Sequence, residues 1–287
     1  MIFIILSILS LAGIFVIFKI AEKQNTSIIN IIVINYFAAS IIGFLQSKSN
    51  PLDIIGKEWL FMAVLIGLFF FVFFVIIGWS TKLVGLSITT VAAKMSVVIP
   101  IIFSIIYYNE DVSILKITGI LAAVSGVILT VYKPSNNEVK KTGLSEILVP
   151  VILFIGMGIS DSMVKYSQNA YLQNESPALF NASLFLISFV SSVLYGLFTK
   201  EIFGIFKAKT ILLGLLLGFL NFYGIYFFIK ALGSEIFDSS IIFGINNVGI
   251  VSLSVLTGLF LFKEKLYKIN KLGILVSIIA IFILSQA

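Results

Sequence analysis

The residues of this chain that could carry chemistry are few, and the most informative of them interrupt long apolar segments. Lys94 and Asp161 are ionisable side chains inside such segments. An ionisable group near the centre of a bilayer costs about 2.5–3.5 kcal/mol on insertion scales, so it normally faces a cavity or a partner. A buried ammonium group can bind an anion such as a carboxylate. We therefore expect Lys94 to face a binding cavity, although a lysine can also snorkel to the membrane surface.

The surroundings of Lys94 favour a site for an anion. Ser87 and Thr90 precede it by seven and four residues, which places all three on one face of a helix. Pro100 follows six residues later and has no N–H group, so it frees the carbonyl of Ser96 and kinks the helix. A lone ammonium group beside loosened backbone predicts a carboxylate site, with Pro100 as a point of bending or gating.

Amide and phenol groups inside other apolar segments are further candidates for substrate binding. Asn246 and Asn247 adjoin each other in the segment near the end of the chain, and Asn221, Asn35 and Tyr36 lie in two earlier segments. Their side chains could hydrogen-bond a substrate across a cavity from Lys94. The alternative is hydrogen bonding between helices, which is commonly worth less than 2 kcal/mol in membranes. For Asn221, Asn35 and Tyr36 the spacing favours packing.

Asp161 and Lys165 form a second pattern with three readings. Their i,i+4 spacing, with the acid on the N-terminal side, suits a salt bridge on one helix. Asp161 could instead take up a proton and couple transport to a proton gradient, or it could pair with Lys94. We group Asp161 and Lys165 as candidates for coupling or gating.

The composition places these residues in a membrane protein. Hydrophobic residues make up 60% of the 287 residues and charged residues 11%, whereas a soluble domain carries roughly 25% charged residues. The chain has no Cys and no His, which excludes thiolate metal sites, HExxH zinc sites and Ser-His relays. We expect no cofactor and no metal. All 19 cations are Lys and lie between apolar runs, which indicates membrane topology rather than binding to nucleic acid.

Ten segments are long and apolar enough to cross a bilayer as helices, since a span needs about 20 apolar residues. They are joined by short loops with legible breakers, so the function must lie within the helical bundle. A run of Phe at 69–71, 73 and 74 in the third segment is expected to face lipid. The predicted segments are 2–20, 28–46, 59–80, 86–107, 113–132, 145–165, 177–198, 208–230, 237–261 and 268–285.

Lysines are unevenly shared between the two sides of this predicted bundle. The gaps after odd-numbered segments hold thirteen Lys and the gaps after even-numbered segments hold five, with Lys94 left out as intramembrane. The side of a membrane protein that is richer in Lys normally faces the cytoplasm. This count predicts that both termini lie outside.

The two halves of the chain resemble each other. Glu110 closes the fourth segment and Gly119 follows nine residues later, while Glu264 and Gly273 repeat this pattern 154 residues further on. A duplicated unit of five spans explains the match, although chance similarity among apolar helices is the alternative. An odd number of spans inverts the second copy, as in many secondary transporters. The predicted repeats are 1–133 and 145–287, with a linker at 134–144.

The run from Ala92 to Pro100, followed by Asn109-Glu110 and Gly119, is similar to the signature of the EamA family of the drug/metabolite transporter (DMT) superfamily. This resemblance, carried also by the ten spans in two halves, covers nearly the whole chain. It implies an all-α integral membrane fold with two inverted five-helix repeats, and export or uptake of small metabolites by alternating access. Many members keep both termini in the cytoplasm, which conflicts with the lysine count.

These features together favour a secondary transporter over an enzyme or a channel. Lys94 and Ser96, two residues apart, point to different helix faces and do not form a catalytic dyad, and no ATP-binding loop of the GxxxxGK[ST] type is present. We expect a multi-pass protein of a bacterial cytoplasmic membrane, acting as a monomer or homodimer. Its substrate is expected to be a small polar metabolite, an amino acid or a similar carboxylate, with export favoured and protons as a candidate coupling ion. The alternative is a channel or membrane receptor.

Overall fold

The computed structural model describes residues 2–109, 112–132, 143–172, 177–232, 239–284 and 286, and within these ranges the regular elements are all helices. Glu110 of the predicted repeat and most of the predicted linker 134–144 lie outside these ranges. The helices are α1 (Ile2–Lys23), α2 (Ile28–Ser47), η1 (Pro51–Ile54), α3 (Leu60–Leu83), α4 (Leu86–Met95), α5 (Val98–Tyr108), α6 (Ile114–Val131), α7 (Leu144–Tyr171), α8 (Pro177–Phe198), η2 (Glu201–Gly204), α9 (Ala208–Leu232), α10 (Ser239–Leu256), η3 (Thr257–Leu261) and α11 (Lys268–Leu284).

Each of the ten predicted segments coincides with a helix or a pair of consecutive helices. Within the described ranges, eight spans are long and apolar enough to cross a membrane, with α4 and α5 counted together as Leu86–Tyr108. The last two segments are shorter. The apolar helix Ile245–Leu261 comprises the later part of α10 together with η3, and α11 has 17 residues. The chain is therefore an all-α, multi-pass membrane protein.

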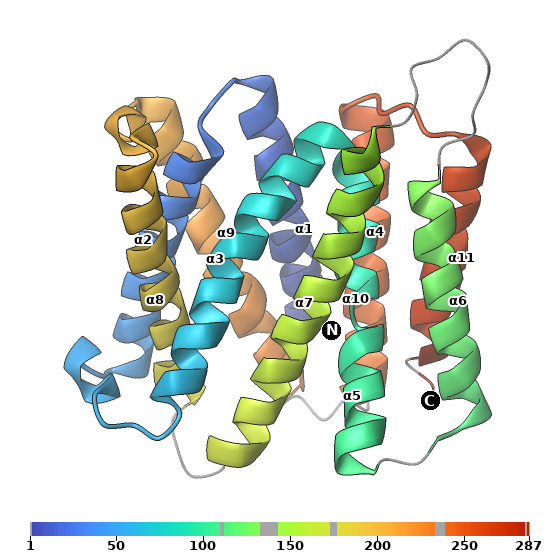
Figure 1. The fold of residues 1–287 in the computed structure, drawn as a ribbon, viewed down its shortest axis with the longest axis horizontal. Coiled ribbons are helices and arrows are strands. Elements are labelled where there is room, and N and C mark those ends of the chain that lie inside the picture. The colour runs from blue at the N-terminus through green and yellow to red at the C-terminus, as the bar shows by residue number, and fades with distance from the viewer. Residues whose placement is uncertain are drawn as a thin grey trace.

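The helices run alternately up and down, so their ends gather at two ends of the bundle (Figure 1). At the upper end in Figure 1, α1, α3, α8 and η3 end, and α2, α4, α9 and α11 begin. We call this the Lys-rich end, and the opposite end the Lys-poor end. The described lysines at the Lys-rich end are Lys19, Lys23, Lys82, Lys200, Lys207, Lys209, Lys263, Lys265, Lys268 and Lys271.

The packing divides the bundle into groups that meet at α4. At one side of Figure 1, α2 packs against α8 and α9, and α3 packs against α7 and α8. At the other side α6 packs along α11. Between them α4 contacts α7, α10 and α6, and α1 joins α9 to α10. A short helix at the centre is therefore held by neighbours from both halves of the chain.

The fourth span breaks into α4 and α5 where Pro100 predicts. Pro100 has no N–H group for the carbonyl of Ser96, and its ring crowds that carbonyl. The helix is interrupted after Met95, and the N–H of Ile99 takes over by donating to the Ser96 carbonyl at 2.9 Å. The Ser96 hydroxyl donates to the carbonyl of Ala93 at 2.6 Å. Thus α4 ends in the interior of the bundle, one residue after Lys94.

Small residues allow α9 to approach α2 closely. A Cβ built on Gly214 would lie 2.5 Å from the Cβ of Ile34, and one built on Gly218 would lie 2.6 Å from the carbonyl oxygen of Asn35. Real Cβ atoms do not approach other atoms this closely, so only glycine fits. Close approach of this kind is how helices associate in membranes, where lipid is as apolar as the side chains.

The phenylalanine run of α3 corrects one expectation. Phe71 and Phe73 are buried in the main apolar cluster, and Phe69, Phe70 and Phe74 pack against that cluster. The Phe73 ring occupies the space that a side chain at residue 156 would take, since a Cβ on Gly156 would lie 1.7 Å from its Cζ atom. The run packs α3 against its neighbours instead of facing lipid as bulk.

Gly218→Ala is expected to destabilise the protein. The added methyl group would meet backbone of α2, which cannot move aside as a flexible side chain could, and overpacking of this kind costs about 1–3 kcal/mol. Gly196→Ala in α8 is the matched control, because the nearest atoms to its Cβ would lie at an ordinary 3.5 Å. Thermal unfolding in detergent measures the difference. Equal midpoints for the two variants would contradict the close contact between α2 and α9.

Candidate functional site

Lys94 lies near the inner end of α4, beside the break in the fourth span. It follows Leu86, the first residue of α4, by eight residues, or about 12 Å along the helix. Its side chain is half-buried and lies next to the buried Ala93 and Met95. Among the described residues its ammonium group makes no hydrogen bond and no ion pair. Its one electrostatic partner is Asp161.

Asp161 reaches the same region from α7. It lies one turn after Gly158, at which a Cβ would be 2.5 Å from Ile99 in the first turn of α5. This contact places Asp161 at the level of the break between α4 and α5. Its side chain is accessible, whereas Ser160 and Ser162 on either side of it are buried. Asp161 also has no direct ion pair within the described ranges, and Lys94 is its electrostatic partner.

Lys94 and Asp161 thus carry opposite charges on α4 and α7, two helices that pack against each other. Each retains accessible surface, and no ion pair within 4.0 Å joins them in the described part of the chain. The ammonium group of Lys94 can donate hydrogen bonds to a carboxylate, and the carboxylate of Asp161 can accept them from an ammonium group or can bind a proton. This arrangement suits a zwitterion, whose carboxylate would pair with Lys94 and whose ammonium group would pair with Asp161.

Lys165 does not form the ion pair with Asp161 that the i,i+4 spacing suggested. Its ammonium group instead donates to the hydroxyl of Ser104 on α5, and it lies 5.7 Å from the centre of the Tyr108 ring. A lysine that meets a hydroxyl and an aromatic face on the neighbouring helix has an alternative to the carboxylate one turn away. The side chain of Asp161 is therefore left for Lys94.

The two asparagines of α10 lie in different surroundings. Asn246 is buried, and its Oδ1 atom has no hydrogen-bond partner in the part of the chain that the structure describes. Asn247 is half-buried and lies one turn before Val251, which belongs to the same buried cluster as Val91 and Met95 of α4. Asn247 therefore lies at the α10 face that packs on α4. A buried acceptor without a partner is costly unless water or a ligand satisfies it.

Asn35, Asn221 and Tyr36 serve helix packing in this structure. Asn221 on α9 donates its amide to the Oδ1 atom of Asn35 on α2 at 3.3 Å. The hydroxyl of Tyr36 donates to the carbonyl of Phe70 on α3 at 2.8 Å. All three side chains are buried. Hydrogen bonds between α2 and its neighbours account for these residues, although the Nδ2 atom of Asn35 remains without a partner in the described ranges.

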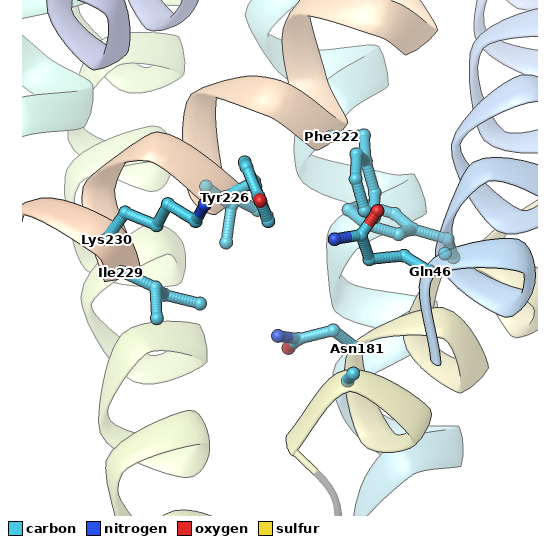
Figure 2. Close-up of a pocket in the computed structure, with 10 residues that line it drawn as sticks. Gln46, Asn181, Phe222, Tyr226, Ile229 and Lys230 are labelled. Carbon is cyan, nitrogen blue, oxygen red and sulfur yellow. The ribbon is translucent and has the colours of Figure 1, made fainter. Parts of the chain in front are cut away.

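A cavity of about 410 Å³ opens where α2, α8 and α9 meet at the Lys-poor end (Figure 2). Gln46, Asn181 and Lys230 supply its polar groups, and Figure 2 shows the amide of Asn181 and the side chain of Lys230 on facing helices. The Lys230 ammonium group lies 4.9 Å from the centre of the Tyr226 ring. The remaining lining is mostly apolar and comprises Gly43, Ala178, Phe185, Phe222, Ile225 and Ile229.

Sequence reasoning did not single out this cavity. Lys230 was counted only as one of the lysines that set topology, and Gln46 was not considered. The usable signal was the i,i+4 spacing of Tyr226 and Lys230 near the end of an apolar segment, which lets the ammonium group lie over the ring. The meeting of three helix ends at one cavity depends on tertiary packing and has no sequence signal.

Comparisons with known proteins show what the chain is similar to. A family model described as the EamA-like transporter family matches residues 1–132, which confirms the predicted resemblance; this family consists of transporters, not enzymes. An uncharacterized protein of Haemophilus influenzae is 29% identical over 293 residues, covering 98% of this chain and 96% of that protein. One solved crystal structure has a TM-score of 0.63 at 11% identity, covering 98% of this chain and 94% of the other, and shows a likeness of fold alone.

The contact between Asn35 and Asn221 can be tested as a packing interaction. Asn35→Ala and Asn221→Ala are each expected to lower thermal stability, with a coupling energy in the double-mutant cycle of about 0.6 kcal/mol and at most about 1.7 kcal/mol. Transport per folded molecule should persist, since the two amides hydrogen-bond each other. Loss of transport without loss of stability would instead show that they contact substrate.

Proposed function

We propose that this chain is a secondary transporter. The match of residues 1–132 to the EamA-like transporter family of the DMT superfamily supports this proposal. The substrate of the chain is a small metabolite with a carboxylate, such as an amino acid, and the chain works by alternating access. One observation carries this proposal: Lys94 and Asp161 are opposite charges on the packed helices α4 and α7, near the break in the fourth span, and no direct ion pair joins them in the described part of the chain. A transporter needs such a site, at which a polar substrate can replace its lost hydration.

The charges of the pair favour a substrate that carries both signs. A lone ammonium group would bind any small anion, but Asp161 beside it repels a substrate that carries only negative charge. An amino acid presents a carboxylate for Lys94 and an ammonium group for Asp161. The half-buried Asn247 and the unpaired Oδ1 atom of the buried Asn246 supply further hydrogen-bonding groups on α10.

The cavity at the Lys-poor end supports the same substrate class. It combines one cation, Lys230, and two amides with an aromatic and aliphatic wall, and such sparse polar groups in an apolar lining are typical of small-molecule sites. Its volume suits a small metabolite. A carboxylate compound with an apolar side chain fits both this cavity and the inner charged pair.

The packing of the helices supports two inverted repeats at 1–133 and 145–287. If the second copy begins with α7, several contacts between the halves have a counterpart five spans later: α1 packs on α9 as α7 packs on α3, and α1 packs on α10 as α7 packs on α4. Likewise α2 packs on α9 as α8 packs on α3. Alternating access then consists of the two copies rocking around the inner site.

The lysine distribution supports an orientation and a direction. The Lys-rich end would face the cytoplasm of the cell, which puts the start of α1 and the end of α11 outside. The cavity of Figure 2 lies at the Lys-poor end, which would then face the outside of the cell. An exporter releases its substrate on that side, so we favour export, with Asp161 as the group that could exchange a proton for it.

Lys94→Ala is expected to abolish transport in proteoliposomes while leaving folded protein in the membrane, because the variant lacks the ammonium group that binds the carboxylate. Counterflow of a labelled amino acid measures exchange, and counterflow separates a transporter from a channel. Lys209→Ala, which changes an exposed lysine at the start of α9, is the matched control. Full activity of Lys94→Ala would remove Lys94 from the site.

Asp161→Asn tests coupling to protons. The amide has the same shape as the carboxyl group but neither ionises nor exchanges a proton at neutral pH, so transport by the variant should no longer respond to an imposed pH gradient. Transport driven by a substrate gradient alone should continue at a measurable rate. A pH response equal to that of the unaltered protein would reject Asp161 as the coupling group.

A further inference from the structure

Glu264 lies between η3 and α11, and its carboxylate caps the first turn of α4, which is distant in the sequence. Its Oε1 atom accepts the N–H of Leu86 at 2.5 Å, and its Oε2 atom accepts the N–H of Ser87 at 3.1 Å and the Ser87 hydroxyl at 2.8 Å. The first N–H groups of a helix lack partners within the helix and carry partial positive charge. A carboxylate that accepts two of these N–H groups and a hydroxyl forms a strong, directional contact.

The chain leaves room for this carboxylate on two sides. Gly85, at φ +95°, has a backbone conformation that suits glycine, and a Cβ there would lie 2.6 Å from Oε1 of Glu264. A Cβ on Gly258 would lie 2.7 Å from Oε2. The N–H of Glu264 donates to the carbonyl of Gly258 at 2.9 Å, which holds the segment after η3 in place. Larger residues at either position would displace the carboxylate.

Lys19 ties α1 and α3 into the same contact. Its ammonium group lies 3.9 Å from Oε1 of Glu264 and 2.6 Å from Oε2 of Glu22, and it donates to the carbonyl of Thr81 at 3.4 Å. The Glu264 carboxylate, together with the Lys19 ammonium group, therefore joins the ends of α1, α3 and α4 to the segment between η3 and α11. All of these belong to the Lys-rich end of the bundle.

Through α4, this contact also fixes the inner site. Only ten residues form α4, with the carboxylate of Glu264 at its outer end and Lys94 in its last turn. Because the break at Ser96 separates α4 from α5, α4 can tilt as a short rigid body. Any movement of its capped end then moves Lys94 relative to Asp161 on α7.

We propose that Glu264 is a latch, that is, a contact that closes the Lys-rich end. While its carboxylate caps α4, the path from this end to the inner site at Lys94 and Asp161 is closed. Release of the carboxylate lets α4 move and opens this path. The proposal rests on the transport function proposed above. Glu264 is a positioning residue, since it acts through α4 and does not itself bind the substrate. The cap selects which end of the bundle is open.

The absence of Cys from the sequence allows a direct test with one reporter cysteine. Thr90 is fully buried and lies between the capped end of α4 and Lys94, so Thr90→Cys should react slowly with a membrane-impermeant maleimide. Adding Glu264→Gln should raise the labelling rate from the Lys-rich side about tenfold or more, as loss of a hydrogen bond to a charged group predicts. Lys209→Cys in a separate sample identifies that side of the vesicle.

Three further variants sharpen the result. Glu22→Gln is the matched control, since Glu22 pairs with Lys19 but does not contact α4, and it should leave the rate unchanged. Ser87→Ala removes one of the three donors and should give a smaller rise, which keeps the test decisive if Glu264→Gln folds poorly. Glu264→Asp keeps the charge and should restore part of the slow labelling.

Each outcome decides the proposal. A rise confined to the Lys-rich side and to variants of the cap supports it. An unchanged rate in both cap variants, an equal rise from both sides, or the same rise with Glu22→Gln would overturn it. The labelling needs no substrate, so a protein that shows the sided change but fails in the transport assays would retain the latch and lose only the proposed function.

Discussion

A charged group in a hydrocarbon layer is tolerated only where protein, water or a ligand answers its charge, and this constraint divides the polar residues of the bundle into two kinds. Asn35 and Asn221 satisfy each other, and Lys165 meets Ser104, so these residues hold helices together. Lys94 and Asp161 carry opposite charges, keep accessible surface and form no direct ion pair in the described part of the chain. We therefore propose this pair as the place where a polar substrate binds.

The proline break gives this arrangement its mechanical meaning. A continuous helix from Leu86 to Tyr108 would be locked along its whole length, whereas the break after Met95 makes α4 a separate short helix. The N–H groups of its first turn donate to the carboxylate of Glu264, and its last turn carries Lys94. In the proposed mechanism, the binding site and the closure of one side of the membrane therefore both depend on α4.

Much of the fold could be predicted because a bilayer imposes a length and a hydropathy on each span. The predicted segments and the break near Pro100 follow from local residue types. Expectations about which neighbours the side chains face were less successful. The phenylalanine run of α3 is packed within the protein, and Lys165 turns to α5 instead of to Asp161. Lys230 is more than a topological charge, since it lines a cavity.

Composition and spacing alone therefore specify an all-α membrane bundle, the position of the break in its fourth span and the short set of ionisable residues within its apolar segments. The partners of those residues depend on tertiary structure: which helix faces Lys94, what Glu264 caps, and which helix ends enclose a cavity. The physical reason is that lipid and protein interior are about equally apolar. A hydrophobic helix carries little sign of which face meets lipid, so only packing with distant segments decides it.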